Sequence, residues 1–258
     1  MSEIGYACAE GVGRIELNRP PANSYHIDVI RALDAAITAA ESDPGCRVVV
    51  LRSALPGFFC GGADIKRFLA NTPRQNMDFI AVAHECLSRI GLSEKIYIAE
   101  IAGHALGGGL EFALACDLRF AAKGQYRLGL PEVTLGILPG NGGTQRLPAL
   151  IGASRALEMM ITGAPVSPEE AHRIGLIDRL CEPGELAGQT MAFARTLAGS
   201  ATFAIGRIKR SVWDGTGLPL EAGLAHERRN IGLLFQSEDA REGFAAFTEK
   251  RKAKFTGR

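Results

Sequence analysis

Apolar and polar residues alternate near the start of the chain and then change to other spacings. The alternation over residues 4–17, around two glycines, predicts a β-hairpin. Apolar residues then return at helical spacing over 27–40. The continuous apolar run 48–51 is typical of a strand that is covered on both faces.

Strands and helices go on alternating up to residue 121. We predict helices at 77–90 and 110–115, strands at 96–101 and 118–121, and glycine-rich loops at 57–63 and 103–109. Strands that are separated by helices connect through right-handed crossovers. The first half of the chain is therefore predicted to be an α/β structure with stacked parallel strands.

Beyond about residue 145 the pattern is mostly helical. Ser167 can cap a helix in which Pro168 takes the first position and two glutamates follow in the first turn. The later apolar patterns predict further helices at 187–197, 203–212, 220–234 and 238–255. The basic residues near the end are typical of a solvated helix terminus.

Composition excludes several classes of protein. With 47% hydrophobic and 22% charged residues among 258, the chain is expected to fold, and its net charge of +1 gives no bias toward nucleic acid or an anionic membrane. No run of 18 apolar residues and no secretory leader is visible. The six cysteines are scattered, which favours free thiols and a cytoplasmic location, and no metal-ligand spacing occurs.

The familiar nucleophile, phosphate-loop and dinucleotide motifs are absent, which leaves the two glycine-rich loops as candidate sites. Each loop follows a predicted strand, and the second opens a helix with free N–H groups. One N–H group from each loop would form an oxyanion hole. Tight packing of strand against helix is the alternative explanation for either loop alone.

Two glutamates favour a catalytic role for the glycine-rich loops over a purely structural one. Glu111 falls inside an apolar run, where an unpaired charge would be costly, and Glu132 follows Pro131 with no cation beside it in sequence. Either one alone would more often be a surface residue or a helix cap. Together, near two oxyanion candidates, they indicate general acid–base catalysis.

The chain resembles the enoyl-CoA hydratase/isomerase (crotonase) superfamily, and the resemblance runs in order along nearly its whole length. The motifs that carry it are Leu17–Pro20, Phe59–Lys66, Gly103–Asp117, Leu130–Gly136, Pro139–Leu147, Gly175–Asp178 and Arg241–Phe244 with the tail to Phe255. The resemblance implies a spiral of repeated ββα units over 1–195 and a helical trimerisation region over 196–258. It also implies a homotrimer or a dimer of trimers.

By the same resemblance, the substrate is an acyl-CoA whose thioester oxygen meets the N–H groups of Ala63 and Gly108. The segment Ala63, Asp64, Ile65 and Lys66 would line the CoA site, with Lys66 near the phosphates or the adenine. The paired hydratase glutamates correspond to Glu111 and Glu132. The implied reaction is reversible hydration of trans-2-enoyl-CoA with no metal or redox cofactor.

Two segments depart from the usual pattern. The stretch 121–128 is one residue longer than in the usual hydratase, which leaves the relative placement of the two glutamates open. Tyr25 and His26 are unusual; they could shape the acyl pocket or only join a loop to a helix. A 3,2-trans-enoyl-CoA isomerase, a hydroxyacyl-CoA dehydratase, a decarboxylase and a non-catalytic acyl-CoA- or RNA-binding protein stay as alternatives.

Overall fold

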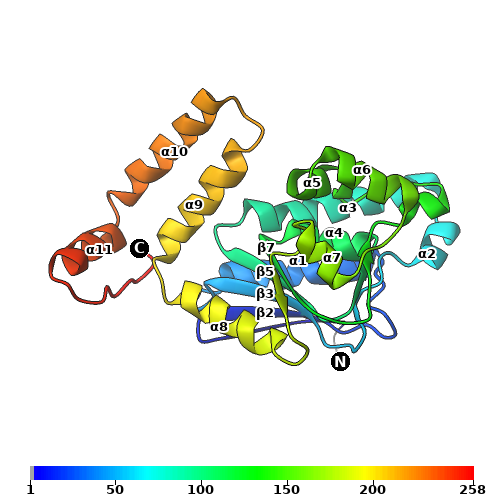
Figure 1. The fold of residues 1–258 in the computed structure, drawn as a ribbon, viewed down its shortest axis with the longest axis horizontal. Helices are drawn as coiled ribbons and strands as arrows, with labels where there is room; N and C mark the ends of the chain where they lie inside the picture. Colours follow the sequence, from blue (N-terminus) through cyan, green and yellow to red (C-terminus); the bar gives the residue numbers. More distant parts are fainter. Residues whose placement is uncertain (1–2) are drawn as a thin grey trace.

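The computed structural model describes residues 3–258 and contains two β-sheets, a set of covering helices and a helical C-terminal region (Figure 1). The larger sheet has the order β1-β2-β3-β5-β7-β9. Its strands are β1 (Ile4–Ala9), β2 (Val12–Leu17), β3 (Val48–Ser53), β5 (Ile96–Ile101), β7 (Leu118–Ala122) and β9 (Arg179–Cys181). The β1–β2 pair is antiparallel, as the predicted hairpin requires, and every later pair is parallel.

A second sheet of three short parallel strands lies beside the first. It has the order β4-β6-β8, with strands β4 (Phe58–Cys60), β6 (His104–Leu106) and β8 (Leu128–Gly129). The chain passes from a strand of the large sheet to one of the small sheet and then to a helix, three times over. This winding confirms the predicted spiral of ββα units, and it brings three successive loops to one end of the small sheet.

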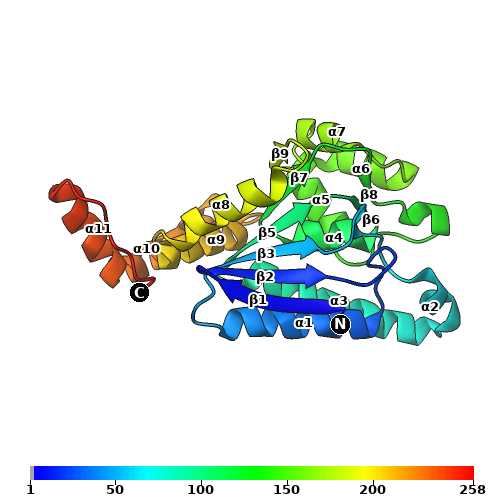
Figure 2. The same ribbon diagram turned by 90° about the horizontal axis from the view of Figure 1, so that it is seen from below.

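Helices cover both faces of the large sheet (Figure 2). On one face lie α1 (Ile27–Ser42) and α3 (Pro73–Leu92), and on the other lies α8 (Leu186–Ala198). The apolar run in β3 serves both cores, because successive strand residues point to opposite faces. Val49 and Leu51 join the larger core, and Val48 and Val50 join the one beneath α8, as predicted for a strand covered on both faces.

Several short elements were not predicted from the sequence. The loop predicted at 103–109 contains β6 and the first residues of α4 (Gly108–Ala115), and the first glycine-rich loop contains β4. Strands of two or three residues are too short to show a period of two, so their pattern is invisible. α2 (Ile65–Ala70) was also missed, and α3 starts four residues earlier than predicted because Thr72 and Gln75 form a capping box.

The remaining helices of the spiral follow β8. They are the 3₁₀ helix η1 (Glu132–Leu135), α5 (Gly143–Ile151), α6 (Ala153–Thr162) and α7 (Pro168–Arg173), and the predicted Ser167 cap is confirmed because its side chain accepts from the Glu170 N–H. Within residues 3–258 no helix is long and apolar enough to cross a membrane. No group of three or more potential metal ligands occurs within these residues either.

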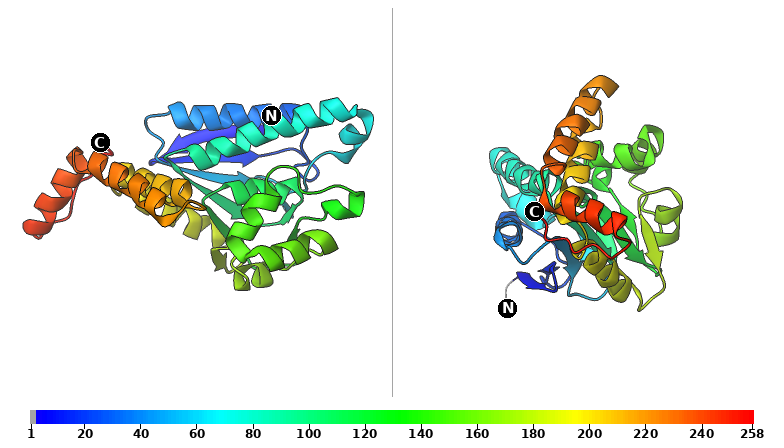
Figure 3. Two further views of the ribbon diagram at one scale, coloured as in Figure 1. Left: turned by 90° about the horizontal axis from the view of Figure 1, so that it is seen from above. Right: turned by 90° about the vertical axis from the view of Figure 1, so that its left-hand side faces the viewer.

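The C-terminal helices extend away from the sheets (Figures 1 and 3). They are α9 (Thr202–Gly215), α10 (Leu220–Leu234) and α11 (Glu238–Thr248). The predicted helix 238–255 is wrong beyond Thr248, because the chain reverses and its tail returns along α11. Asp239 is buried and accepts hydrogen bonds from the N–H groups of Thr256 and Gly257. α8 continues to Ala198, past the predicted domain boundary at 195, which stays a prediction.

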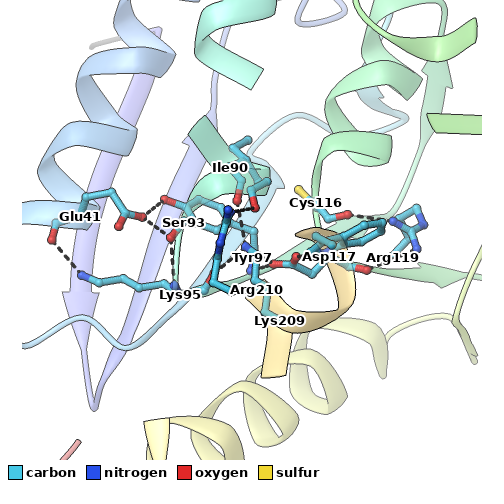
Figure 4. A network of polar contacts seen from close by, with 12 residues as sticks. Glu41, Ile90, Ser93, Lys95, Tyr97, Cys116, Asp117, Arg119, Lys209 and Arg210 are labelled. Atoms are coloured by element: carbon cyan, nitrogen blue, oxygen red, sulfur yellow. Dashed lines mark hydrogen bonds and ion pairs between the residues drawn. The ribbon is translucent and has the colours of Figure 1, made fainter. Parts of the chain in front are cut away.

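A buried lysine fastens α9 to the sheet (Figure 4). The Lys209 ammonium forms an ion pair with Asp117 at 2.8 Å and donates to the carbonyl oxygens of Ile90 and Lys95. It lies 5.6 Å from the centre of the Tyr97 ring. The whole residue is only 4% exposed, so the charge depends on these partners rather than on water.

We expect Lys209→Met to destabilise the fold by about 3–5 kcal/mol, because removing one partner leaves the Asp117 carboxylate buried without its cation. The melting temperature should fall by on the order of 10 °C in a thermal unfolding scan. Lys123→Met is the control: it removes an exposed ion pair with Glu182, and it should leave the melting temperature nearly unchanged. Equal effects of the two substitutions would contradict the anchoring role.

Candidate active site

The N-terminus of α4 supplies one side of the site. Gly107 has φ +54°, a conformation that favours glycine, and a Cβ on Gly108 would lie 1.6 Å from the Tyr25 Oη. Gly109 packs against β4, where a Cβ would lie 2.0 Å from the Cys60 carbonyl oxygen. The glycines therefore allow the helix to begin in close contact with its neighbours, and the N–H of Gly108, in the first turn, has no partner within the helix.

The loop after β4 supplies the other side. Tyr25 forms a parallel bridge with Ala63, in which the Tyr25 N–H donates to Gly62 and the Tyr25 carbonyl accepts from Asp64. In such a bridge the N–H of the middle residue, Ala63, points to the opposite side. A Cβ on Gly62, which has φ +94°, would lie 2.9 Å from the Leu106 carbonyl oxygen and 3.6 Å from the Gly108 nitrogen. The two glycine-rich loops thus lie against each other.

Glu111 lies one turn into α4 and is 1% exposed. Its Oε1 accepts hydrogen bonds from the N–H groups of Asn141 and Gly143, each at 2.7 Å. Burial raises the pKa of Glu111, and these two hydrogen bonds oppose the rise because they favour the ionised form. One carboxylate oxygen of Glu111, Oε1, is therefore held by the backbone.

Glu132 begins η1 and lies against the N-terminus of α4. Its Oε1 lies 2.9 Å from where a Cβ on Gly107 would be, and its Oε2 is buried with no hydrogen-bond partner. Burial, with a further contribution from the charge of Glu111, raises the pKa of Glu132 to about 7. A carboxyl group in this state can carry a proton near neutral pH.

A single cavity of about 280 Å³ contains these groups. Ala63, Gly108, Glu111 and Glu132 all line it, so the extra residue in 121–128 does not separate the two glutamates. The other lining residues are mainly apolar and include Ile65, Phe68, Ile80, Leu106, Leu135, Ile137 and Leu138. The cavity can therefore hold an apolar group with a polar end that is met by N–H donors and two carboxyl groups.

The segment Ala63–Lys66, which is predicted to contact CoA, crosses the start of α2: Ala63 and Asp64 precede the helix, and Ile65 and Lys66 form its first turn. Ala63 and Ile65 line the cavity, and Lys66 is exposed on the helix. The Asp64 side chain accepts from the Lys66 N–H and so caps α2. Asp64 thus has a local structural role in addition to any contact with a ligand.

Sequence reasoning missed the residues that hold Glu111. Asn141 and Gly143 lie in the glycine-rich segment where α5 begins, and the half-buried Arg146 donates to the Asn141 carbonyl oxygen at 2.8 Å. The only sequence signal was that glycine-rich segment itself. The Asn141 side chain also donates to the Tyr25 hydroxyl at 2.6 Å, and Tyr25 lines the cavity, which is compatible with the predicted pocket role. His26 does not line this cavity; its side chain caps α1, which is compatible with the predicted loop-to-helix role.

A spiral of ββα units in which two glycine-rich loops and two glutamates line one cavity matches the fold and the motifs of the crotonase class of proteins. The enoyl-CoA hydratase/isomerase family profile matches residues 7–258. The chain belongs to this family, the crotonase superfamily, whose members include enoyl-CoA hydratases and isomerases, and within it the chain is closest to the enoyl-CoA hydratases.

Individual relatives cover the full length. A probable enoyl-CoA hydratase of Bacillus subtilis is 36% identical over 100% of both chains, and a short-chain-enoyl-CoA hydratase of Clostridium acetobutylicum is 36% identical over 93% of this chain and 92% of its own. A crystal structure of the enoyl-CoA hydratase from Bacillus anthracis has a TM-score of 0.95 at 34% identity, with 100% of each chain covered. An (E)-benzylidenesuccinyl-CoA hydratase of Thauera aromatica is 37% identical over 95% of this chain and 96% of its own, so relatives of similar identity carry names with different acyl groups.

Proposed function

We propose that the protein is an enoyl-CoA hydratase, which adds water reversibly to a trans-2-enoyl-CoA to give a 3-hydroxyacyl-CoA. The observation that carries the proposal is the placement of two carboxyl groups with raised pKa, those of buried Glu111 and half-buried Glu132, in one cavity with the N–H groups of two glycine-rich loops. Paired carboxyl groups suit hydration, because water must lose a proton while carbon gains one.

In the proposed mechanism the N–H groups of Ala63 and Gly108 bind the thioester oxygen, where negative charge develops as the enolate forms. Glu111 and Glu132 hold one water molecule between them. The ionised glutamate, Glu111, takes a proton from this water as the water oxygen bonds to the β-carbon, and the protonated Glu132 gives its proton to the α-carbon; proton exchange between the pair then restores the starting state. The buried, unpartnered Oε2 of Glu132 supports this role, because a bound water would satisfy it.

The CoA part of the substrate is proposed to lie along Ala63–Lys66. Ile65 lines the cavity, and Lys66, exposed on α2, is available to a phosphate group. The coenzyme A thioester is the substrate itself, and the proposed reaction uses only side chains and backbone groups of the protein.

We also propose that the protein is a homotrimer or a dimer of trimers and works in the cytoplasm. Large apolar side chains are exposed on and between the C-terminal helices in the single chain, which supports an assembly through this region. They include Ile208, Val212, Trp213, Leu218, Leu220, Ile231, Leu233, Phe235, Phe244 and Phe247. The cytoplasmic location rests on the sequence alone.

The proposal is tested by mixing the protein with crotonyl-CoA and following the absorbance of the conjugated enoyl thioester. We expect the absorbance to fall as the double bond is hydrated, and a 3-hydroxyacyl-CoA to appear by mass spectrometry. A 3-enoyl-CoA tests the isomerase alternative, because isomerisation would raise the same absorbance. If the protein hydrates no enoyl-CoA, whatever the length of its acyl chain, the proposal is contradicted.

The proposed acid–base pair also predicts a pH dependence. Hydration needs one protonated and one ionised carboxyl group, and the two groups titrate as a pair. Since the pKa of Glu132 is raised to about 7, the pair loses its last proton above that pH. We expect kcat/KM for crotonyl-CoA to fall about tenfold per pH unit above about pH 7. A flat profile up to about pH 9 would contradict the proposed protonation state.

A further inference from the structure

A second cavity lies next to the catalytic cavity, behind a wall of aromatic side chains. It has a volume of about 330 Å³ and is lined by the start of α1, by α2 and by the first half of α3. Tyr25 and Phe68 line both cavities, and Phe79 lines the second. These three residues, Tyr25, Phe68 and Phe79, form what we call the aromatic partition.

The rings of the aromatic partition pack against one another. Tyr25 is stacked on Phe79, with ring centres 5.9 Å apart, and Phe68 meets the same Phe79 ring edge-on at 5.1 Å. The other neighbour of Tyr25 is Phe112 of α4, at 4.6 Å. Offset and edge-to-face pairs are the favoured aromatic geometries, so the partition is a cohesive unit built from three separate segments of the chain.

A hydrogen bond fixes the remaining end of Tyr25. Its hydroxyl accepts from the Asn141 side chain at 2.6 Å, and the residue is 1% exposed. Asn141 is in turn fixed, because its backbone N–H holds Glu111 and its carbonyl accepts from Arg146. The Tyr25 ring therefore cannot swing aside without breaking contacts at the reacting end of the cavity.

The partition lies on the α2–α3 side of the catalytic cavity. The reacting groups come from α4, η1 and the loop after β4, whereas Phe68 and Ile80 bring α2 and α3 to the same cavity. Hydrocarbon that leaves the reacting end toward α2 and α3 meets apolar side chains first, and then the partition. Beyond it the lining becomes charged, with Asp28, Arg31, Asp64, Arg67 and Asp78 around the second cavity.

We propose that the aromatic partition sets the acyl-chain length of this protein, so that its substrates are short-chain acyl-CoA thioesters that end at Tyr25 and Phe68. The inference rests on the proposed function, in that an acyl-CoA occupies the cavity. It adds the class of acyl group and the residues that select it.

The test measures dissociation constants of butyryl-, hexanoyl-, octanoyl- and decanoyl-CoA by isothermal titration calorimetry. These saturated thioesters cannot be hydrated, so binding is separated from turnover. For the wild type, affinity should stop rising once the chain fills the catalytic cavity. In Phe68→Ala the octanoyl-to-butyryl affinity ratio should rise at least tenfold, because each newly buried methylene contributes roughly fourfold.

Tyr25→Leu is a second test variant, because it opens the aromatic partition from a different segment; it should also raise the octanoyl-to-butyryl affinity ratio. Two controls show whether a changed ratio comes from the partition or from general destabilisation. Tyr25→Phe keeps the ring and should leave the ratio unchanged. Leu69→Ala removes a side chain that is 88% exposed on the same helix as Phe68, and it should also leave the ratio unchanged. Thermal unfolding of each variant shows whether it is folded.

An unchanged ratio in folded Phe68→Ala and Tyr25→Leu would overturn the proposal, as would wild-type affinity that keeps rising through decanoyl-CoA. If neither variant folds, the wild-type series decides alone. A wild type that binds butyryl-CoA but hydrates no enoyl-CoA would sink the proposed reaction and leave the partition to be judged on binding. A wild type that binds no acyl-CoA would overturn both.

Discussion

Glu132→Gln and Glu111→Gln are each expected to lower kcat for hydration of crotonyl-CoA by about 10²–10⁴, the range that general acid–base catalysis contributes. Glutamine keeps the shape of the side chain and removes its ability to exchange a proton. In Glu111→Gln the amide oxygen can still accept from the N–H groups of Asn141 and Gly143, so the fold should persist. The measurement is the rate of loss of enoyl-thioester absorbance under saturating substrate.

If the two substitutions affect only the chemical step, the variants must still bind acyl-CoA. Butyryl-CoA should bind both variants with a dissociation constant close to that of the wild type. The double variant should lose little more than either single one, since the two groups act as a unit. The matched control is Glu100→Gln, which alters another buried glutamate, one paired with Arg52 and outside the cavity lining. A Glu100→Gln loss as large as the other two would point to general destabilisation instead.

Gly108→Ala is expected to lower kcat by about 10²–10³, the cost of losing one donor of an oxyanion hole. Its methyl group would lie 1.6 Å from the Tyr25 Oη and 2.7 Å from the Tyr25 Cζ, so the start of α4 must shift and carry the Gly108 N–H with it. The dissociation constant of butyryl-CoA should change less than kcat, because negative charge on the thioester oxygen develops only during the reaction.

Gly91→Ala is the control for this glycine. Gly91 also lies in a helix, and a Cβ there would meet nothing within 4 Å. It should leave kcat unchanged. The double variant Gly108→Ala with Tyr25→Ala removes the clashing ring and should recover part of the lost activity. Full activity in the single Gly108→Ala variant would contradict the role of its N–H.

Much of the fold was visible in the sequence because its long elements have a strong periodic signal. The hairpin 4–17, the buried strand 48–51 and the helix at 27–40 are all present in the structure. The short elements were not visible. β4, β6 and β8 each have two or three residues, and no spacing rule can detect so few. They are nevertheless the strands that carry the glycine-rich loops.

The two carboxyl groups of the candidate site could be predicted from the sequence. The residues that hold them in place could not. Glu111 was recognisable because an unpaired carboxylate inside an apolar run is costly, and Glu132 because no cation is beside it in sequence. The family motifs then matched both residues. The hydrogen bond from Asn141 to Tyr25 joins residues 116 positions apart, and no local pattern announces it. The same is true of the aromatic partition, whose rings come from three segments.

By itself, the sequence indicated the order of the long helices and strands and singled out the two carboxyl groups, because these are properties of local spacing and of residue type, and its motifs showed the resemblance to the family. The tertiary structure alone decided that the two glutamates share one cavity, that burial raises the pKa of Glu132 to about 7, and that aromatic rings from three segments pack beside that cavity. Proton affinity and pocket depth depend on which distant segments exclude water from a group, and only the winding of the chain fixes those neighbours.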